Sequence, residues 1–162
     1  MYASQENEKS YRSLFDNMLE GFASCKVLFE DNRPQDFVVL DVNRAFKDLL
    51  GRPDVIGKKG TEIIPDLRES YPEMLEAFGR VALTGWPERF EVYLKRSAIW
   101  IYASLYTTKI GYFFAVFSDI TKQKKAENAL LESERRFRET LETIDLVAVM
   151  VDLEGNITFC ND

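Results

Sequence analysis

The sequence contains no histidine. This absence removes the usual general base of nucleophilic triads, the commonest metal ligand and the proximal ligand of most haem proteins. The two cysteines, Cys25 and Cys160, lie far apart without CxxC or metal-ligand spacing, so neither a disulfide framework nor a metal site is predicted. No set of nucleophile, base and oxyanion donors can be assembled, and we therefore do not expect an enzyme.

Excess positive charge and long apolar runs are also lacking. The 21 Lys and Arg residues are outnumbered by 27 Asp and Glu residues, and a net charge of -6 argues against a nucleic acid partner. The longest uncharged stretch, residues 97–108, is too short to span a bilayer, and Glu6 and Glu8 stand where a signal peptide is apolar. We expect a cytoplasmic chain without direct membrane contact, which leaves open a membrane anchor elsewhere in a longer protein.

With 162 residues, of which 46% are hydrophobic, the chain can bury a core of one ordinary domain. An amphipathic helix is predicted within residues 1–20, capped at Ser4 or Ser10 and ended by Gly21. Strands over 22–30 and 37–40 then pair as a hairpin around a turn at 31–34. A short helix follows Asn43 and closes at Gly51. Its apolar face consists of Ala45, Phe46, Leu49 and Leu50.

The second half of the domain predicts one longer helix and a strand meander. Pro72 opens the helix and Gly85 ends it. Strands are expected over 89–95, 98–107 and 111–119. In the last two strands both alternating sets of side chains are apolar, whereas an antiparallel sheet usually has one solvated face. Both faces should therefore be covered, one by the small helices and the other by the N-terminal helix, a partner chain, or both.

Residues 121–144 contain no glycine or proline and predict a long solvated helix with charged pairs at i,i+4 spacing, such as Glu132 with Arg136 and Arg135 with Glu139. Its apolar positions recur in alternating steps of four and three, which is typical of a coiled coil. This seam consists of Ala126, Leu130, Ser133, Phe137, Thr140 and Ile144.

A repeat links the two ends of the chain. The pattern of residues 11–18 recurs at 137–144, Glu20-Gly-Phe-Ala23 matches Asp145-Leu-Val-Ala148, and Val39-Leu-Asp-Val-Asn43 matches Thr158-Phe-Cys-Asn161. Such self-similarity indicates that a second copy of the domain begins at residues 145–162 and is cut off.

Three motifs in order identify a family resemblance over residues 11–121. Leu40-Asp-Val-Asn-Arg-Ala-Phe46 with Leu49-Leu-Gly51, Val55-Ile-Gly-Lys58 and the closing Asp119-Ile-Thr121 resemble landmarks of the PAS sensory domain, the last as part of its PAC motif. The resemblance implies an α+β fold: a five-stranded antiparallel sheet with small helices on one face, an N-terminal helix and a C-terminal signalling helix. The expected organisation is an N-terminal helix (1–20), a PAS core (21–120), a signalling helix (121–144) and the start of a second PAS domain (145–162).

Some PAS domains carry haem or flavin, but we expect neither cofactor here. The usual haem ligation needs histidine. The light-sensing LOV subgroup has an adduct-forming cysteine in a motif for which this sequence has Gly57-Lys-Lys-Gly-Thr-Glu-Ile-Ile64. Cys25 lies outside that motif and reads as a buried small hydrophobe.

The resemblance assigns one alternating set of strand residues to the inside, facing the helices. Two alternatives follow for this space: a cavity that binds a small apolar ligand, or a packed core without one. The candidate lining residues are Phe46, Leu50, Ile56, Ile64, Phe78, Ala82, Phe90, Val92, Leu94, Ile101, Ala103, Leu105, Phe113, Ala115 and Phe117.

The resemblance implies a regulatory module of a bacterial-type two-component or similar signalling protein. It would form a homodimer and act on a kinase or cyclase effector in the same chain, through Asp119 and through Thr121 as the N-cap of the signalling helix. The alternatives are a ligand-free dimerisation and coupling module, and a small α+β enzyme using carboxylates such as Asp41 and Glu62, which no motif supports. The dimer-interface candidates are Leu14, Phe15, Met18, Trp100, Tyr112 and Phe114.

Overall fold

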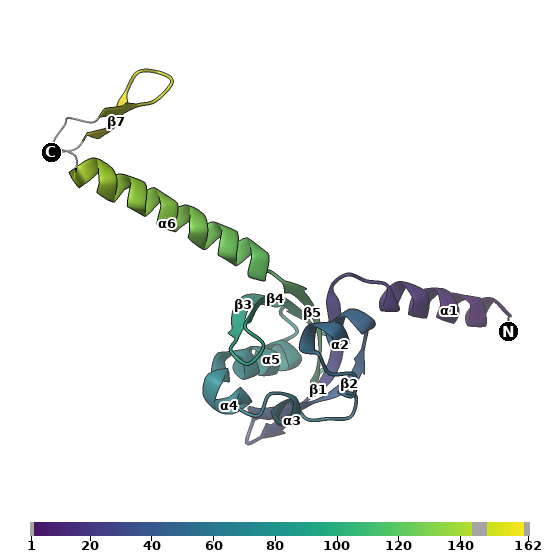
Figure 1. Ribbon diagram of the computed structural model, residues 1–162. Helices are drawn as coiled ribbons and strands as arrows, with labels where there is room; N and C mark the ends of the chain where they lie inside the picture. The colour runs from purple at the N-terminus through teal and green to yellow at the C-terminus, as the bar shows by residue number, and fades with distance from the viewer. Residues whose placement is uncertain (1, 144–148, 161–162) are drawn as a thin grey trace. The chain divides into compact units, whose positions relative to one another are not determined.

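The computed structural model describes residues 2–143 and 149–160. The chain divides after Ile120 into two compact units, each described by itself (Figure 1). The elements of the first unit are α1 (Tyr2–Asp16), β1 (Gly21–Glu30), β2 (Arg33–Val42), α2 (Arg44–Leu50), α3 (Gly60–Ile63), α4 (Leu67–Ser70), α5 (Pro72–Thr84), β3 (Glu88–Leu94), β4 (Ile99–Tyr106) and β5 (Tyr112–Asp119).

The five strands form one antiparallel sheet in the order β2-β1-β5-β4-β3, which confirms the predicted fold class. The hairpin between β1 and β2 turns more tightly than expected, because Arg33 and Pro34 belong to β2. Only Asp31 and Asn32 form the turn, with φ of 48° and 61°. Two consecutive positive φ values match the twist of the flanking strands, and Asp and Asn tolerate them better than most residues.

Local signals define the two main helices. The Asn43 side chain accepts a hydrogen bond from the Phe46 amide at the start of α2, and Gly51 ends that helix in the left-handed region. Pro72 stands at the start of α5, and Gly85, with φ of 79°, ends it. Both helices therefore have the boundaries that the sequence predicts.

The core lies between the sheet and the helices α2 to α5, with α5 contacting all five strands (Figure 1). The inward set of strand residues is the predicted one, since Ile101, Ala103, Leu105, Phe113 and Ala115 are all buried. On α5 the predicted apolar face, Leu75, Phe78, Val81 and Ala82, is buried against them.

The N-terminal helix differs from the sequence prediction. It ends at Asp16, five residues before Gly21, and both Ser4 and Ser10 lie inside it instead of capping it. Its one buried side chain in the described range is Phe15, whose ring lies edge-on to Phe22 at 5.0 Å between centroids. Two interactions hold the C-terminal end of α1: the contact of Phe15 with β1, and the Asn17 side chain, which donates to the Ser13 carbonyl at 2.7 Å directly after the last helical residue.

The second unit begins with α6 (Thr121–Thr143), followed by a hairpin of β6 (Val149–Val151) and β7 (Ile157–Cys160). None of the α6 side chains, all within the described range, is buried. The predicted pairs Glu132 with Arg136 and Arg135 with Glu139 are confirmed, with N–O distances of 2.9 and 3.4 Å. Ile144, the matching stretch 145–148 and Asn161 lie outside the described residues.

Candidate functional site

A small apolar cavity lies between the inner sheet face and the helices. Its volume is about 50 Å³, which is room for one or two water-sized groups, whereas ligand pockets usually measure roughly 300–1,000 Å³. Its lining consists of Ala23, Cys25, Phe37, Phe46, Leu49, Leu50, Ile63, Ile64, Met74, Phe78, Val92, Leu94, Ile101, Phe113 and Phe117.

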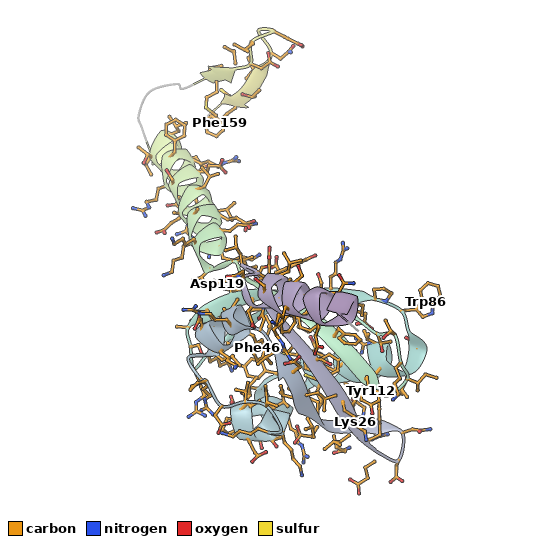
Figure 2. The ribbon with its side chains drawn as sticks, turned by 90° about the vertical axis from the view of Figure 1, so that its right-hand side faces the viewer. Lys26, Phe46, Trp86, Tyr112, Asp119 and Phe159 are labelled. Atoms are coloured by element: carbon orange, nitrogen blue, oxygen red, sulfur yellow. The ribbon has the colours of Figure 1, made fainter. Side chains whose placement is uncertain are left out.

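Aromatic packing fills most of this space. The rings of Phe78 and Phe113 stack at 4.4 Å, and Phe37 meets both edge-on at 5.3 and 5.7 Å. Phe46, which Figure 2 shows between α2 and the sheet, contacts Phe117 at 5.4 Å. These pairs connect α5 and α2 to the strands β2 and β5 through packed rings, so a substitution at one ring disturbs the packing of its neighbours.

The predicted lining needs one correction and several relocations. Ile56 is 49% exposed, and its neighbour Val55 is buried in its place, because the chain after Val55 runs along the edge of β2, where the Gly57 amide donates to the Val39 carbonyl at 2.7 Å. The remaining predicted residues that do not line the cavity belong to the surrounding core. They are Ala82, Phe90, Ala103, Leu105 and Ala115, so the alanines add close packing instead of open space.

Sequence reasoning missed the contribution of the first hairpin to the cavity. Ala23 and Cys25 on β1 and Phe37 on β2 line it, as do Ile63 and Met74. The buried, alternating positions of β1 were the available signal.

The two cysteines lie in opposite environments. Cys25 is 2% exposed in the cavity wall, and burial raises the pKa of its thiol far above the ordinary value, so it is a packing residue as predicted. Cys160 is exposed on β7.

Two buried polar residues connect the elements around the core. The Asn43 side chain accepts hydrogen bonds from the amides of Phe22 and Phe46 and donates to the Glu20 carbonyl, so it ties the start of β1 to α2. Asp36 accepts from the amide and hydroxyl of Thr61 and thereby ties β2 to α3. All of these groups are satisfied, as buried polar groups need to be.

A PAS domain profile matches residues 9–83, a stretch that runs from α1 into α5 and includes the Asn43 junction. The chain contains a PAS domain. Its strands β3 to β5 follow the matched stretch and complete the sheet.

Two solved structures are similar to this PAS-containing chain. A domain of an HTR-like protein from Haloarcula marismortui has a TM-score of 0.48 and 18% identity, over 64% of this chain and all of that one. The PAS domain of BvgS from Bordetella pertussis has a TM-score of 0.44 and 19% identity, over 87% of this chain and 99% of that one. A search of curated proteins found no match.

PAS domains are sensory modules, so the match supports the regulatory class predicted from the sequence. Across residues 2–143 and 149–160, no cluster of three or more Cys, Asp or Glu side chains is placed to hold a metal ion. In the same ranges no helix has both the length and the apolarity needed to cross a membrane.

The end of the PAS sheet leads directly into the long helix. β5, the central strand, ends at Asp119, and the Ile120 amide donates to the Trp100 carbonyl at 2.9 Å. α6 begins at Thr121 itself, so the predicted N-cap role of Thr121 is wrong by one position. Ile120, whose amide is bonded to β4, stands instead in the position before the helix.

Proposed function

We propose that this chain is a signal-relay PAS module of a larger cytoplasmic signalling protein. It would act on an effector of the sensor kinase or cyclase class through α6, with Asp119 and Thr121 at the point of transmission. The observation that carries the proposal is the covalent continuity of β5 with α6. β5 brings Phe113 and Phe117 to the aromatic cluster, and its next residues begin a helix without a buried side chain.

The packed core favours a signal-relay function over the binding of a ligand in the apolar cavity. About 50 Å³ is too small for a typical organic ligand, and Phe37, Phe78 and Phe113 occupy the space that such a ligand needs. Packed cores transmit strain because they deform little before they rearrange. Native mass spectrometry tests this part: we expect the chain mass alone, and a retained small molecule would favour the sensor with a core-bound ligand.

The helix α6 has the properties of a marginal two-chain coiled coil. Its seam contains Leu130 and Phe137, which are 61% and 56% exposed, but Ser133 and Thr140 interrupt it. A seam with few large apolar residues gives a weak association. A small rearrangement at the end of the sheet can then shift it.

Dimer formation would also use the outer sheet face and the free part of α1. Trp100, Tyr112 and Phe114 are only partly buried there, and Leu14 is 72% exposed. Phe15, a predicted interface residue, packs on Phe22 of its own chain and is therefore not available to a partner. In sedimentation, Leu14→Asp with Phe114→Asp should shift the protein to monomers, whereas Trp86→Ser, at a 77% exposed side chain, should not. An unchanged dimer would reject this interface.

The relay is tested by insertions in α6 of the parent protein. Inserting seven residues after Glu132 keeps the seam in register, so regulation of the effector should survive. Inserting three or four residues turns the following segment to another face and should lock or invert the output. The measurement is effector activity with and without the signal. An equal response for every insertion length would show that α6 is a tether.

A further inference from the structure

A second, polar pocket of about 70 Å³ lies beside the apolar cavity. Leu50, Ile63, Ile64 and Leu94 line both spaces, so a single layer of side chains separates them. The polar members come from four connections between helices or strands, and they are Arg52, Asp66, Tyr71, Arg96 and Ser97.

Two exposed arginines bring positive charge to the edge of the pocket. Arg52 follows α2, and Arg96 lies in the turn between β3 and β4. Within the described part of the chain neither guanidinium forms an ion pair, and Arg52 has only a long hydrogen bond, 3.3 Å, to the Glu62 carbonyl. Guanidinium groups with free donors bind carboxylates through paired, planar hydrogen bonds.

Asp66 adds an acceptor that lacks a donor. Its Oδ1 atom is buried in a half-exposed residue and accepts no hydrogen bond from any described residue. A hydrogen bond from the Ser70 hydroxyl, then one from the amide of Asp66 itself, and then the charges of Arg96 and Lys95 lower the pKa of the carboxyl, which is therefore ionised at neutral pH. A buried carboxylate oxygen without a donor is unfavourable, so this geometry fits a hydrogen-bond donor from outside the chain.

We propose that this pocket binds a small carboxylate whose neighbouring carbon carries an amino or hydroxyl group. The carboxylate pairs with Arg52 and Arg96, the amino or hydroxyl group donates to Asp66 Oδ1, and a short aliphatic tail lies against Leu50 and Ile64. At about 70 Å³ the pocket cannot enclose a whole organic ligand any more than the apolar cavity can, so it takes only the head of an amino acid or 2-hydroxy acid and leaves the rest of the molecule at the surface, where Arg52 and Arg96 are exposed. This inference goes beyond the proposed relay, because it places a ligand outside the packed core.

The position of the pocket gives such a ligand a route to the sheet. Arg96 and Ser97 belong to the turn that begins β4, and β4 pairs with β5 from Ile101 opposite Asp119 to Tyr106 opposite Phe114. Closing the two arginines on one carboxylate would draw this turn toward α2.

Titration calorimetry on the whole chain tests the proposal. Leucine or 2-hydroxy-4-methylpentanoate should bind at least tenfold more tightly than 4-methylpentanoate, which lacks the donor, and than leucinamide, which lacks the carboxylate. Arg96→Gln and the milder Arg96→Lys should each weaken binding at least tenfold, and Asp66→Ala, which removes the acceptor, should remove the preference for the donor. Arg89→Gln, an exposed arginine on β3 outside this pocket, is the matched control and should not change affinity.

Three outcomes would overturn the proposal. Equal binding of 4-methylpentanoate or of inorganic phosphate would mean a general anion site, equal loss in Arg89→Gln would mean a non-specific charge effect, and no binding of any probe would mean a hydrated pocket. The assay needs no effector, so its failure leaves the α6 insertion test untouched, and the reverse also holds. Circular dichroism of each variant, compared with the wild type, is the control for correct folding.

Discussion

Replacing Asn43 with alanine is expected to be among the most damaging polar substitutions in this PAS domain. The side chain is completely buried and forms three hydrogen bonds, to the Phe22 amide at 2.8 Å, the Glu20 carbonyl at 2.9 Å and the Phe46 amide at 3.0 Å. The last bond caps α2, and losing an N-cap costs about 1 kcal/mol.

The other two bonds raise the cost further. Alanine leaves the Phe22 amide and the Glu20 carbonyl without their partner, at about 1 kcal/mol each or somewhat more where water does not reach. The sum is about 3 kcal/mol, a large part of a typical folding free energy of about 5–15 kcal/mol. With an ordinary urea dependence of about 2 kcal/mol per molar, the midpoint should fall by about 1.5 M.

Urea unfolding followed by far-ultraviolet circular dichroism measures this shift. Arg44→Ala is the control, because Arg44 is the next residue of the same helix and its side chain is 81% exposed in a loose pair with Asp48 at 3.8 Å. Its effect should stay below about 0.5 kcal/mol. If Asn43→Ala lowers the free energy of unfolding by less than about 1 kcal/mol, or by no more than Arg44→Ala does, the hydrogen bonds of Asn43 do not stabilise the connection between β1 and α2.

Three further substitutions test the packing and the charge pair. Phe113→Ala should lower the free energy of unfolding by about 3–5 kcal/mol and open a cavity that binds xenon or benzene. Either ligand should then raise the Tm of the variant but not that of the wild type. An equal rise in the wild type would contradict a filled core. Gly79→Ala should be destabilising although alanine favours helices, since its Cβ would lie 2.6 Å from Pro34 Cγ, and an unchanged Tm would show that the helix and hairpin can separate freely. The Arg80 guanidinium, through a hydrogen bond, lowers the pKa of Glu88. The difference in free energy of unfolding between wild type and Glu88→Gln should therefore be present at pH 7, at most about 1 kcal/mol, and vanish as the pH falls from the ordinary carboxyl pKa through the lowered one. Thermal unfolding across this pH range measures it, and a difference that persists at pH 2 would exclude the ion pair as its source.

The sequence predicted those features that local chemistry determines. Asn43 and Gly51 enclose one helix, Pro72 and Gly85 enclose another, and alternation in β4 and β5 separated the inner side chains once the resemblance had chosen the face. Contacts between distant segments were not accessible in this way. Val55 instead of Ile56 is buried because the following residues bond to the edge of β2, and Phe15 is buried because β1 presents Phe22 to it.

The candidate sites show the same division. Phe46, Phe78 and Phe113 were predicted for the cavity from their periodicity together with the family resemblance, whereas the volume of the cavity depends on how the rings stack. The polar pocket was not predicted because Arg52, Asp66 and Arg96 belong to loops and turns. In such segments no periodic pattern indicates which way a side chain points.

The contrast between the two cysteines makes the natural sequence a single-site labelling substrate. A maleimide reagent needs an accessible thiolate, which the buried Cys25 with its raised pKa does not offer, so only Cys160 should react under native conditions. A spin label or fluorophore can thus be attached beyond α6 without any mutation. In a parallel pair of α6 helices, two such labels would lie at the same end, close enough for dipolar spectroscopy to measure their separation. An antiparallel pair would place them a helix length apart.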